Sequence, residues 1–283
     1  MERNLQDRSR RFCWVNERGE NMSSDLFEYN PLSMSKGEVR GHKVVQKFGR
    51  ALSGMQIKVT DIWDRADAAP TQSIWTAPTA ARKHVMLSTS VNDSAGGTGM
   101  RTVEVFGLRD WAEKETNETI TLMGPISSVV TTHPYVIIHR MKGKTFGSGG
   151  SANLGEVRAL AQADSTITAQ ILVKEGQTQM AIYGIPSVQD AYMTSFYTNI
   201  LRAGGAAVAV DIKVVTNPEP DSQLTTFVTK HTTGVTKDGS SHSHHVFDTP
   251  KKFPGPCIIK LQGVASSADT DCSGGFDLIL VDK

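Results

Sequence analysis

Residues 207–215 read AVAVDIKVV, in which apolar and polar side chains alternate. In an extended chain the branched residues at positions 208, 210, 212 and 214 share one face, and Asp211 and Lys213 share the other. A period of two is that of a half-buried β-strand. The stretch therefore predicts a strand that packs one face against an apolar core.

The same alternation recurs in residues 101–108, 118–122 and 191–200. In the last of these it places three side chains on one face, opposite Ser195 and Asn199: Tyr192, Phe196 and Ile200. Residues 276–282 read FDLILVD and are apolar on both faces, which predicts a strand in the interior of a sheet. Apolar residues with helical spacing are not sustained over three turns anywhere in the chain.

Turn signals rich in Gly, Pro and Asp separate these strands, for example at residues 93–97, 147–150 and 217–221. Short strands with such punctuation are typical of antiparallel sandwiches. We expect a mostly β protein with two antiparallel β-sandwich or jelly-roll-like domains and an extended N-terminal arm. The predicted ranges are 1–42 for the arm, 43–145 for the first domain and 146–283 for the second, with residues 147–155 as a hinge or long loop. One sandwich that exchanges strands between the halves is the alternative.

The composition describes a globular chain without an obvious chemistry. Thirty basic and 29 acidic residues give a formal charge of +1, which argues against a protein that coats nucleic acid or an anionic membrane. The three cysteines, Cys13, Cys257 and Cys272, form no CxxC pair, so the sequence supports neither a disulfide scaffold nor a zinc site. No apolar run approaches the roughly 20 residues that span a bilayer, and residues 1–4 lead into a charged stretch rather than a secretory signal.

Catalytic and cofactor motifs are missing from the sequence. The stretch GSGGSANLG at residues 147–155 lacks the GK[ST] of a phosphate-binding loop and precedes a predicted strand. The GGTG at residues 96–99 lacks the βαβ context of a dinucleotide site. Because no nucleophile elbow or SxxK box is present either, we expect no catalytic residue, no bound cofactor and no enzymatic activity.

The histidines of SHSHHV offer the only weak candidates for a metal site. On a strand His242 and His244 would share one face, and Asp248 or a symmetry-related chain could add further ligands. The alternative is a polar strand flank, and a cupin-type centre is disfavoured because no histidine follows His245. His139 is interpreted as an ordinary strand residue.

Residues 87–108, LSTSVNDSAGGTGMRTVEVFGL, followed by NETITLMG at residues 117–124, resemble a segment of structural proteins from tailed bacteriophages, especially marine and environmental ones. The resemblance extends over residues 43–283 in register. It includes KFGR at 47–50, DIWD at 61–64, YVII at 135–138, GSGG at 147–150, EGQTQMAIY at 175–183 with Ile185-Pro186, and GGFDLILV at 274–281. The sequence departs from the pattern at WAEK, residues 111–114, and at the added histidines.

This resemblance implies a non-enzymatic structural component of a tailed-phage virion, assembled in the host cytoplasm. It implies a symmetric homo-oligomer, a trimer or a hexamer-type ring, that binds other virion proteins at the neck, baseplate, tail or head. From the charge balance we also expect no specific nucleic acid and no membrane as partner. The alternative is a receptor- or glycan-binding tail-fibre module whose loops, such as residues 237–245, contact the host.

Residues 1–42 lie outside the resemblance. They are rich in charge and carry only a few large apolar side chains, among them Phe12, Trp14, Leu26 and Phe27. So few anchors cannot bury a core alone, since ordering each residue costs about 1–2 kcal/mol. We expect an arm that packs on a neighbouring subunit, and packing on its own first domain is the open alternative.

Overall fold

A computed structural model describes residues 14–15, 21–22, 31–55, 58–64, 74–77, 79–203, 208–222 and 226–283. The chain divides into two units, residues 1–40 and 41–283. In the first unit, β1 (Trp14–Val15) pairs antiparallel with β2 (Asn21–Met22), and α1 (Pro31–Ser35) is a single short helix. The division between the units lies close to the predicted end of the arm at residue 42.

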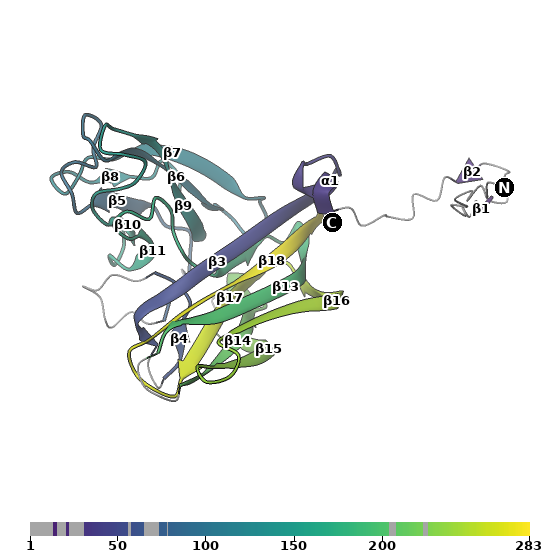
Figure 1. The fold of residues 1–283 in the computed structure, drawn as a ribbon. Coiled ribbons are helices and arrows are strands. Elements are labelled where there is room, and N and C mark those ends of the chain that lie inside the picture. Colours follow the sequence, from purple (N-terminus) through teal and green to yellow (C-terminus); the bar gives the residue numbers. More distant parts are fainter. Residues whose placement is uncertain are drawn as a thin grey trace, which may run out of the picture. The chain divides into compact units, whose positions relative to one another are not determined.

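The second unit is mostly β, as predicted, and every strand pairing described in it is antiparallel (Figure 1). One 3₁₀ turn, η1 (Pro220–Ser222), is the only helical element described there. The strands, in chain order, are β3 (His42–Met55), β4 (Thr60–Asp61), β5 (His84–Ser88), β6 (Met100–Leu108), β7 (Thr116–Thr121), β8 (Val129–Val130), β9 (Ile137–Phe146), β10 (Val157–Ala161), β11 (Ile167–Ile171), β12 (Ile182–Ile185), β13 (Gln189–Arg202), β14 (Ala209–Asn217), β15 (Val228–Thr236), β16 (His242–Pro254), β17 (Cys257–Ala265) and β18 (Thr270–Asp282).

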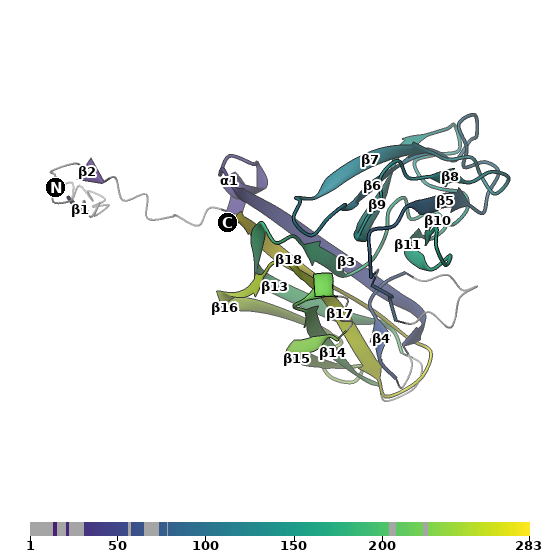
Figure 2. The same ribbon diagram turned by 180° about the vertical axis from the view of Figure 1, so that it is seen from behind.

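Two sheets face each other across a first apolar core (Figures 1 and 2). One has the strand order β16-β13-β18-β3, and the other has β12-β17-β14-β15, with β4 paired to β17. Of the strand predicted at 207–215, residues 209–215 are confirmed as part of β14, whose Val210, Ile212 and Val214 are buried in this core, and residue 207 lies outside the described residues. The predicted interior strand at 276–282 is also confirmed, because β18 lies between β13 and β3.

The prediction of which side chains of residues 191–200 share one face of the strand is wrong in part. Ala191 and Met193 face the core, and so does Phe196, although its position has the opposite parity. The register shifts between Met193 and Ser195, where β13 has one residue more than β18. Such a β-bulge switches the faces of the residues that follow it. Tyr192 therefore does not share a face with Phe196.

A second apolar core lies among two further sheets, with strand orders β11-β10-β5-β8 and β7-β6-β9. Strands β12 and β17 are buried on both faces and separate the two cores. Ile182 and Ile258 belong to the second core, whereas Tyr183 and Ile259 belong to the first. The sheet that contains them is the middle layer of this unit, which explains why β12 and β17 are apolar without alternation.

Strand pairing crosses the predicted boundary between residues 145 and 146. β3 pairs with β18, and β10 pairs with β5. The loop at residues 147–155 is fastened to the turn at residues 92–99 by Asp93. The buried carboxylate of Asp93 accepts hydrogen bonds from the backbone N–H groups of Met100, Leu154 and Gly155, at 2.8–2.9 Å. Residues 147–155 therefore connect strands on either side of the predicted boundary that contribute to the same second core.

Candidate functional site

A buried cluster of four polar side chains lies where β3 and β9 approach β12. Lys47 comes from β3, His139 from β9 and Tyr183 from β12, and Glu115 directly precedes β7. The side chains of Lys47 and His139 are only 7% and 1% exposed. Four groups far apart in sequence thus meet in one place.

Glu115 is the centre of this cluster. Its Oε2 atom lies 2.6 Å from Nε2 of His139 and accepts a hydrogen bond from the Tyr183 hydroxyl at 3.1 Å. Its Oε1 atom lies 2.5 Å from Nζ of Lys43. Burial alone would raise the pKa of Glu115, but the hydrogen bonds from His139 and Lys43 and the charge of Lys43 outweigh it and hold the pKa well below its usual range. Glu115 is therefore a carboxylate at neutral pH.

His139 is buried on every side. Its ring lies 4.3 Å from the Tyr183 ring, centroid to centroid. Burial lowers the pKa of His139 below its ordinary value, which keeps the imidazole neutral at pH 7. A neutral ring that donates from Nε2 to Glu115 has an acceptor at Nδ1. This Nδ1 atom is buried and has no hydrogen-bond partner among the described residues.

Lys47 donates a hydrogen bond from Nζ to the backbone oxygen of His139 at 2.5 Å. No carboxylate among the described residues forms an ion pair with it. Burial, helped by the charge of Arg140, lowers the pKa of Lys47 to about 7. Its amine is therefore in large part uncharged at neutral pH, which an exposed lysine is not.

Among the described residues of this unit, two further groups of buried charges form ion pairs, whereas the buried carboxylate of Asp93 is held by hydrogen bonds from backbone N–H groups. Arg50 binds Asp64 through two hydrogen bonds, at 2.8 and 3.1 Å, and Glu175 through one of 2.7 Å. Burial raises the pKa of Asp64 to about 6 despite the guanidinium. Lys260 lies 2.7 Å from Asp61. These ion pairs connect strands and loops of different layers. Each of these buried charges has an oppositely charged partner, which is typical of structural ion pairs.

The predicted metal candidates do not meet in a ligand set. His242 and His244 both lie on β16 and are exposed, and His244 is beside Tyr197. His245 points to the other face, where its ring lies 4.6 Å from that of His231 and 4.6 Å from that of Phe247. Among the described residues no group of three or more His, Cys, Asp or Glu side chains could hold a metal ion.

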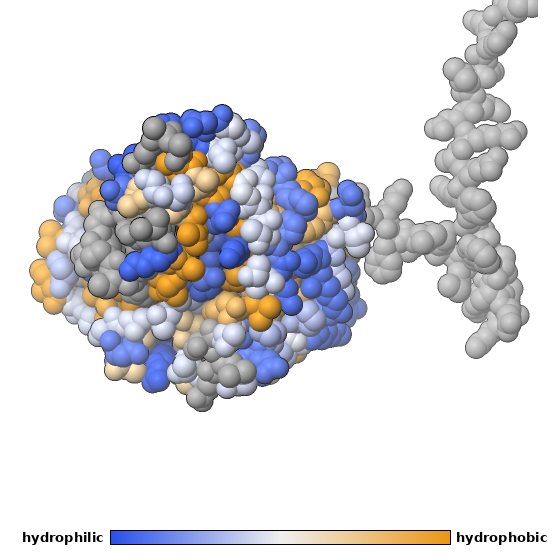
Figure 3. Space-filling view, turned by 90° about the horizontal axis from the view of Figure 1, so that it is seen from below, coloured by the Kyte–Doolittle hydropathy of each residue, from blue (hydrophilic) through white to orange (hydrophobic). Residues whose placement is uncertain are grey.

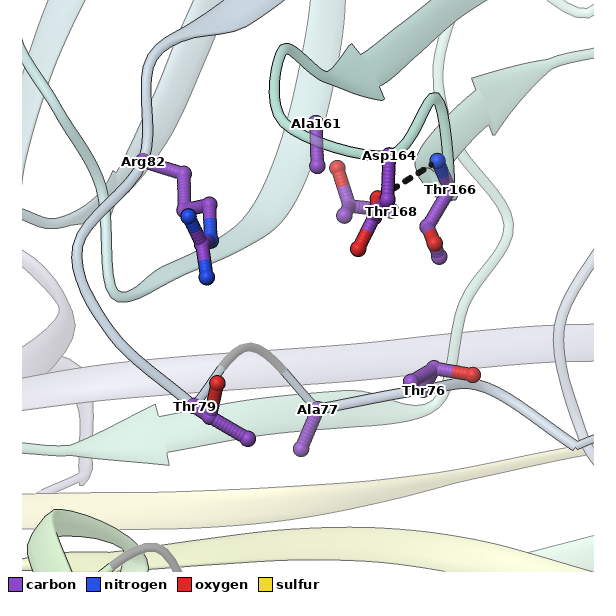
Figure 4. Close-up of a pocket in the computed structure, with 8 residues that line it drawn as sticks. All are labelled: Thr76, Ala77, Thr79, Arg82, Ala161, Asp164, Thr166 and Thr168. Carbon is purple, nitrogen blue, oxygen red and sulfur yellow. Dashed lines mark hydrogen bonds between the residues drawn. The ribbon is translucent and has the colours of Figure 1, made fainter.

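A separate pocket lies beside β10 and β11 (Figure 4). Arg82 and the threonines at positions 76, 79, 166 and 168 line it, and Asp164 accepts a hydrogen bond from the backbone N–H of Thr166 at 2.9 Å. Asp164 is exposed, and the lining includes no buried ionisable side chain. This pocket therefore lacks the features of a catalytic centre.

One feature of the sequence could have indicated the buried cluster. Lys47 has the same parity on its strand as Val45 and Ala51, which are both buried in the first core. A lysine on the apolar face of a strand indicates a buried amine. Glu115, His139 and Tyr183 carry no comparable signal, because only the pairing of distant strands brings them together.

The sequence matches no protein-family model, and no curated protein matches it significantly. The resemblance to phage virion proteins therefore stays a prediction. In the part of the chain that the structure describes, no helix is long and apolar enough to cross a membrane.

Proposed function

We propose that this chain is a non-enzymatic structural component of a tailed-phage virion, and that it assembles as a symmetric homo-oligomer on another virion protein. Within this proposal each apolar core is the interior of one antiparallel sandwich. The two sandwiches take strands from both halves of the chain, whereas the alternative that the sequence left open was one sandwich that exchanges strands between the halves. The likeness of residues 43–283 to phage structural proteins and the β-rich architecture support this function.

The observation that carries the proposal is a long unpaired strand edge. β16 is 13 residues long, and among the described strands only β13 pairs with it through a backbone ladder, while the Thr233 hydroxyl of β15 lies 3.2 Å from the Ser243 hydroxyl of β16. Native proteins usually block such an edge, because it offers free N–H and C=O groups to another chain. The second half of β16 contains two prolines and two lysines, which discourage pairing with another chain: Pro250, Lys251, Lys252 and Pro254. Residues 242–247 contain neither proline nor lysine.

Residues 242–247 of β16 also expose apolar surface. Val246 is 62% exposed and Phe247 is half-buried. β15, the neighbouring edge strand of the middle sheet, adds the exposed Val228. Apolar and hydrophilic residues are interspersed on the face seen in Figure 3, so apolar exposure is not confined to one strand. We infer that β16 is covered by a second copy in the assembled particle.

Light scattering on the purified chain tests the proposal. We expect a closed oligomer, with a three-fold mass for a fibre or decoration trimer and a six- or twelve-fold mass for a ring. Val246→Lys should shift this mass toward the monomer without lowering the melting temperature, whereas Val91→Lys, at an equally exposed turn, should leave it unchanged. A monomer at every concentration would overturn the assembly role. Location of the chain in a density map of the particle would establish its place in the virion.

Truncation of residues 1–40 tests the predicted arm. If the arm packs on a neighbour, the truncated chain keeps its melting temperature at low concentration but loses oligomerisation. A large loss of monomer stability with assembly unaffected would instead favour packing of the arm on its own domain.

A second candidate function is glycan or receptor binding by a tail-fibre module. The rings of Phe196, His231, His245 and Phe247 form one cluster, with centroid distances of 4.6–6.1 Å, beside the loop at residues 237–241. Three of these rings are partly exposed, and exposed ring faces can stack on sugars. Binding of host polysaccharide that Phe247→Ala abolishes, in a chain that does not oligomerise, would favour this candidate.

A further inference from the structure

The two most deeply buried lysines of the described chain differ in one respect. Lys260 is 1% exposed and lies 2.7 Å from the carboxylate of Asp61. Lys47 is nearly as buried, yet no described carboxylate pairs with it, and its one hydrogen bond goes to the backbone oxygen of His139. A buried amine normally has a charged partner, because leaving it unpaired is costly. Pairing with a carboxylate explains how the amine of Lys260 can be buried, but it does not explain the burial of Lys47.

Lys47 also borders an open space. A cavity of about 240 Å³ is lined by Lys43, Lys47, Glu115, His139, Arg140 and Tyr183. A water molecule needs only roughly 10–15 Å³ of such volume, so the cavity can admit a small organic molecule. Lys43 is about half exposed, so the cavity is reached from solvent on that side. The buried Nδ1 atom of His139, which has no described partner, belongs to the same lining residues.

We propose that Lys47 is a covalent binding site for a small carbonyl compound that carries an anionic group. The Nζ lone pair attacks the carbonyl carbon, and the two amine hydrogens leave with the carbonyl oxygen as one molecule of water. The product is an imine between Lys47 and the ligand. No oxidant or reductant takes part, and no turnover follows, so this inference goes beyond the proposed structural function and does not depend on it.

The arrangement around Nζ suits this reaction. An uncharged amine that donates one N–H to the His139 oxygen keeps its lone pair free for attack. Burial lowers the pKa of Lys47 to about 7, so about half of the molecules carry the reactive amine at pH 7. An exposed lysine with an ordinary pKa near 10.4 carries it in only about one molecule in 2,500 at pH 7. Glu115 does not compete for Nζ, since Lys43, His139 and Tyr183 occupy its oxygens.

Arg140 sets the preference for an anionic ligand. It lines the cavity, lies over the Phe106 ring at 5.7 Å, and donates a hydrogen bond to the side chain of Gln177. No described carboxylate pairs with it, unlike Lys43, whose charge is matched by Glu115. A guanidinium without a carboxylate partner is suited to bind a carboxylate or phosphate of the ligand. The cavity thus combines an amine for a carbonyl with a free cation for an anion.

Reductive trapping tests the proposal on the full chain. The protein is incubated at pH 7 with glyoxylate and cyanoborohydride, and the modified lysines are located by peptide mass spectrometry. We expect Lys47 to be modified at least ten-fold faster than the exposed Lys83. Equal or slower modification of Lys47 in the folded protein would overturn the site. Lys47→Arg, which keeps the positive charge, should remove the fast adduct and leave that of Lys83.

Acetaldehyde serves as the neutral comparison probe. We expect Lys47 to react several-fold faster with glyoxylate than with acetaldehyde, and Arg140→Gln to abolish this difference while the reaction with acetaldehyde persists. Equal rates for the two probes in the native chain would refute the anionic class of ligand, and this result does not depend on the folding of any variant. Glu115→Gln gives an independent check, because loss of the carboxylate lowers the pKa of Lys47 and shifts the pH profile of modification to lower pH.

Discussion

The Nζ atom of Lys260 in β17 lies 2.7 Å from Oδ2 of Asp61 in β4, and neither side chain is more than 1% exposed. The same oxygen accepts a hydrogen bond from the backbone N–H of Trp75 at 2.7 Å, and the Phe227 ring lies 4.0 Å from the ammonium group. Burial raises the pKa of Asp61 and lowers that of Lys260, and each charge counteracts the shift of the other. The pair connects the segment after β3 to the middle sheet.

Asp61→Asn leaves a buried ammonium group without its counter-charge. We expect the free energy of unfolding to fall by about 3–5 kcal/mol, as for other broken buried pairs. Lys260→Met in the same background should restore part of this loss, because it removes the unpaired charge. Urea unfolding of the single and double variants measures both effects. Purely additive losses would contradict the pairing. Lys252→Met, which breaks a solvent-exposed pair with Asp190, should lower the free energy of unfolding far less than Asp61→Asn does.

Asp93→Asn tests the attachment of the loop at 147–155. The native carboxylate accepts three backbone N–H groups and the Ser88 hydroxyl. An amide NH₂ would face at least one of these donors, which costs about 1–3 kcal/mol for each group left unpaired. We expect a lower melting temperature and faster proteolysis within residues 147–155. Asp164→Asn is the matched control, because that exposed carboxylate accepts one backbone N–H group, from Thr166. Unchanged proteolysis of Asp93→Asn would contradict the attachment.

Local sequence patterns were enough to predict individual strands, because they depend on neighbouring residues: alternation predicted β6 and β14, and a short run that is apolar on both faces predicted β18. Alternation did not predict the β-bulge at Thr194 in β13. After this bulge, side chains at even-numbered positions face the core, whereas before it those at odd-numbered positions do. The bulge depends on the pairing of β13 with two other strands, and no feature of the neighbouring sequence indicates it. The middle layer was missed for the same reason, since the sequence does not show that β12 and β17 separate two cores.

The candidate site was even less accessible to sequence reasoning. Lys47 could have been singled out by its place among buried residues of β3. His139 was interpreted as an ordinary strand residue. Glu115 directly follows the WAEK segment, residues 111–114, which was noted only as a departure from the phage pattern. The predicted candidates His242 and His244 share a strand face, as their spacing indicates, but the fold brings no third ligand to them among the described residues.

Leu278 tests the first core. It is fully buried in β18, opposite Met193 on one side and Val45 on the other. Leu278→Ala should lower the free energy of unfolding by about 2–5 kcal/mol, because it removes buried methyl groups and leaves a cavity. Leu278→Asp should prevent folding altogether, since its carboxylate would have no partner there. Val281→Ala, at a partly exposed position of the same strand, should cost less than half as much as Leu278→Ala. Equal costs at the two positions would contradict the assigned burial.

Lys47 predicts a specific dependence of stability on pH. Its pKa is about 7 in the folded chain and near 10.4 in the unfolded chain. Between these values the unfolded chain binds more protons, so the stability of the native protein rises with pH across this window. The cost of burying the amine is complete below about pH 7 and disappears as the pH approaches 10.4.

Lys47→Met removes this cost, so its advantage over the native chain should be largest at pH 7 and should shrink as the pH rises to 10. Within the window the difference should change by about 1.4 kcal/mol for each pH unit. Urea unfolding of both proteins at several pH values from 6.5 to 10 measures it. Lys83→Met, at an exposed position, should follow the native curve throughout. Parallel curves for the native chain and Lys47→Met would mean that the buried amine keeps its proton in the folded state, and would remove the physical basis for its reaction with carbonyl compounds at neutral pH.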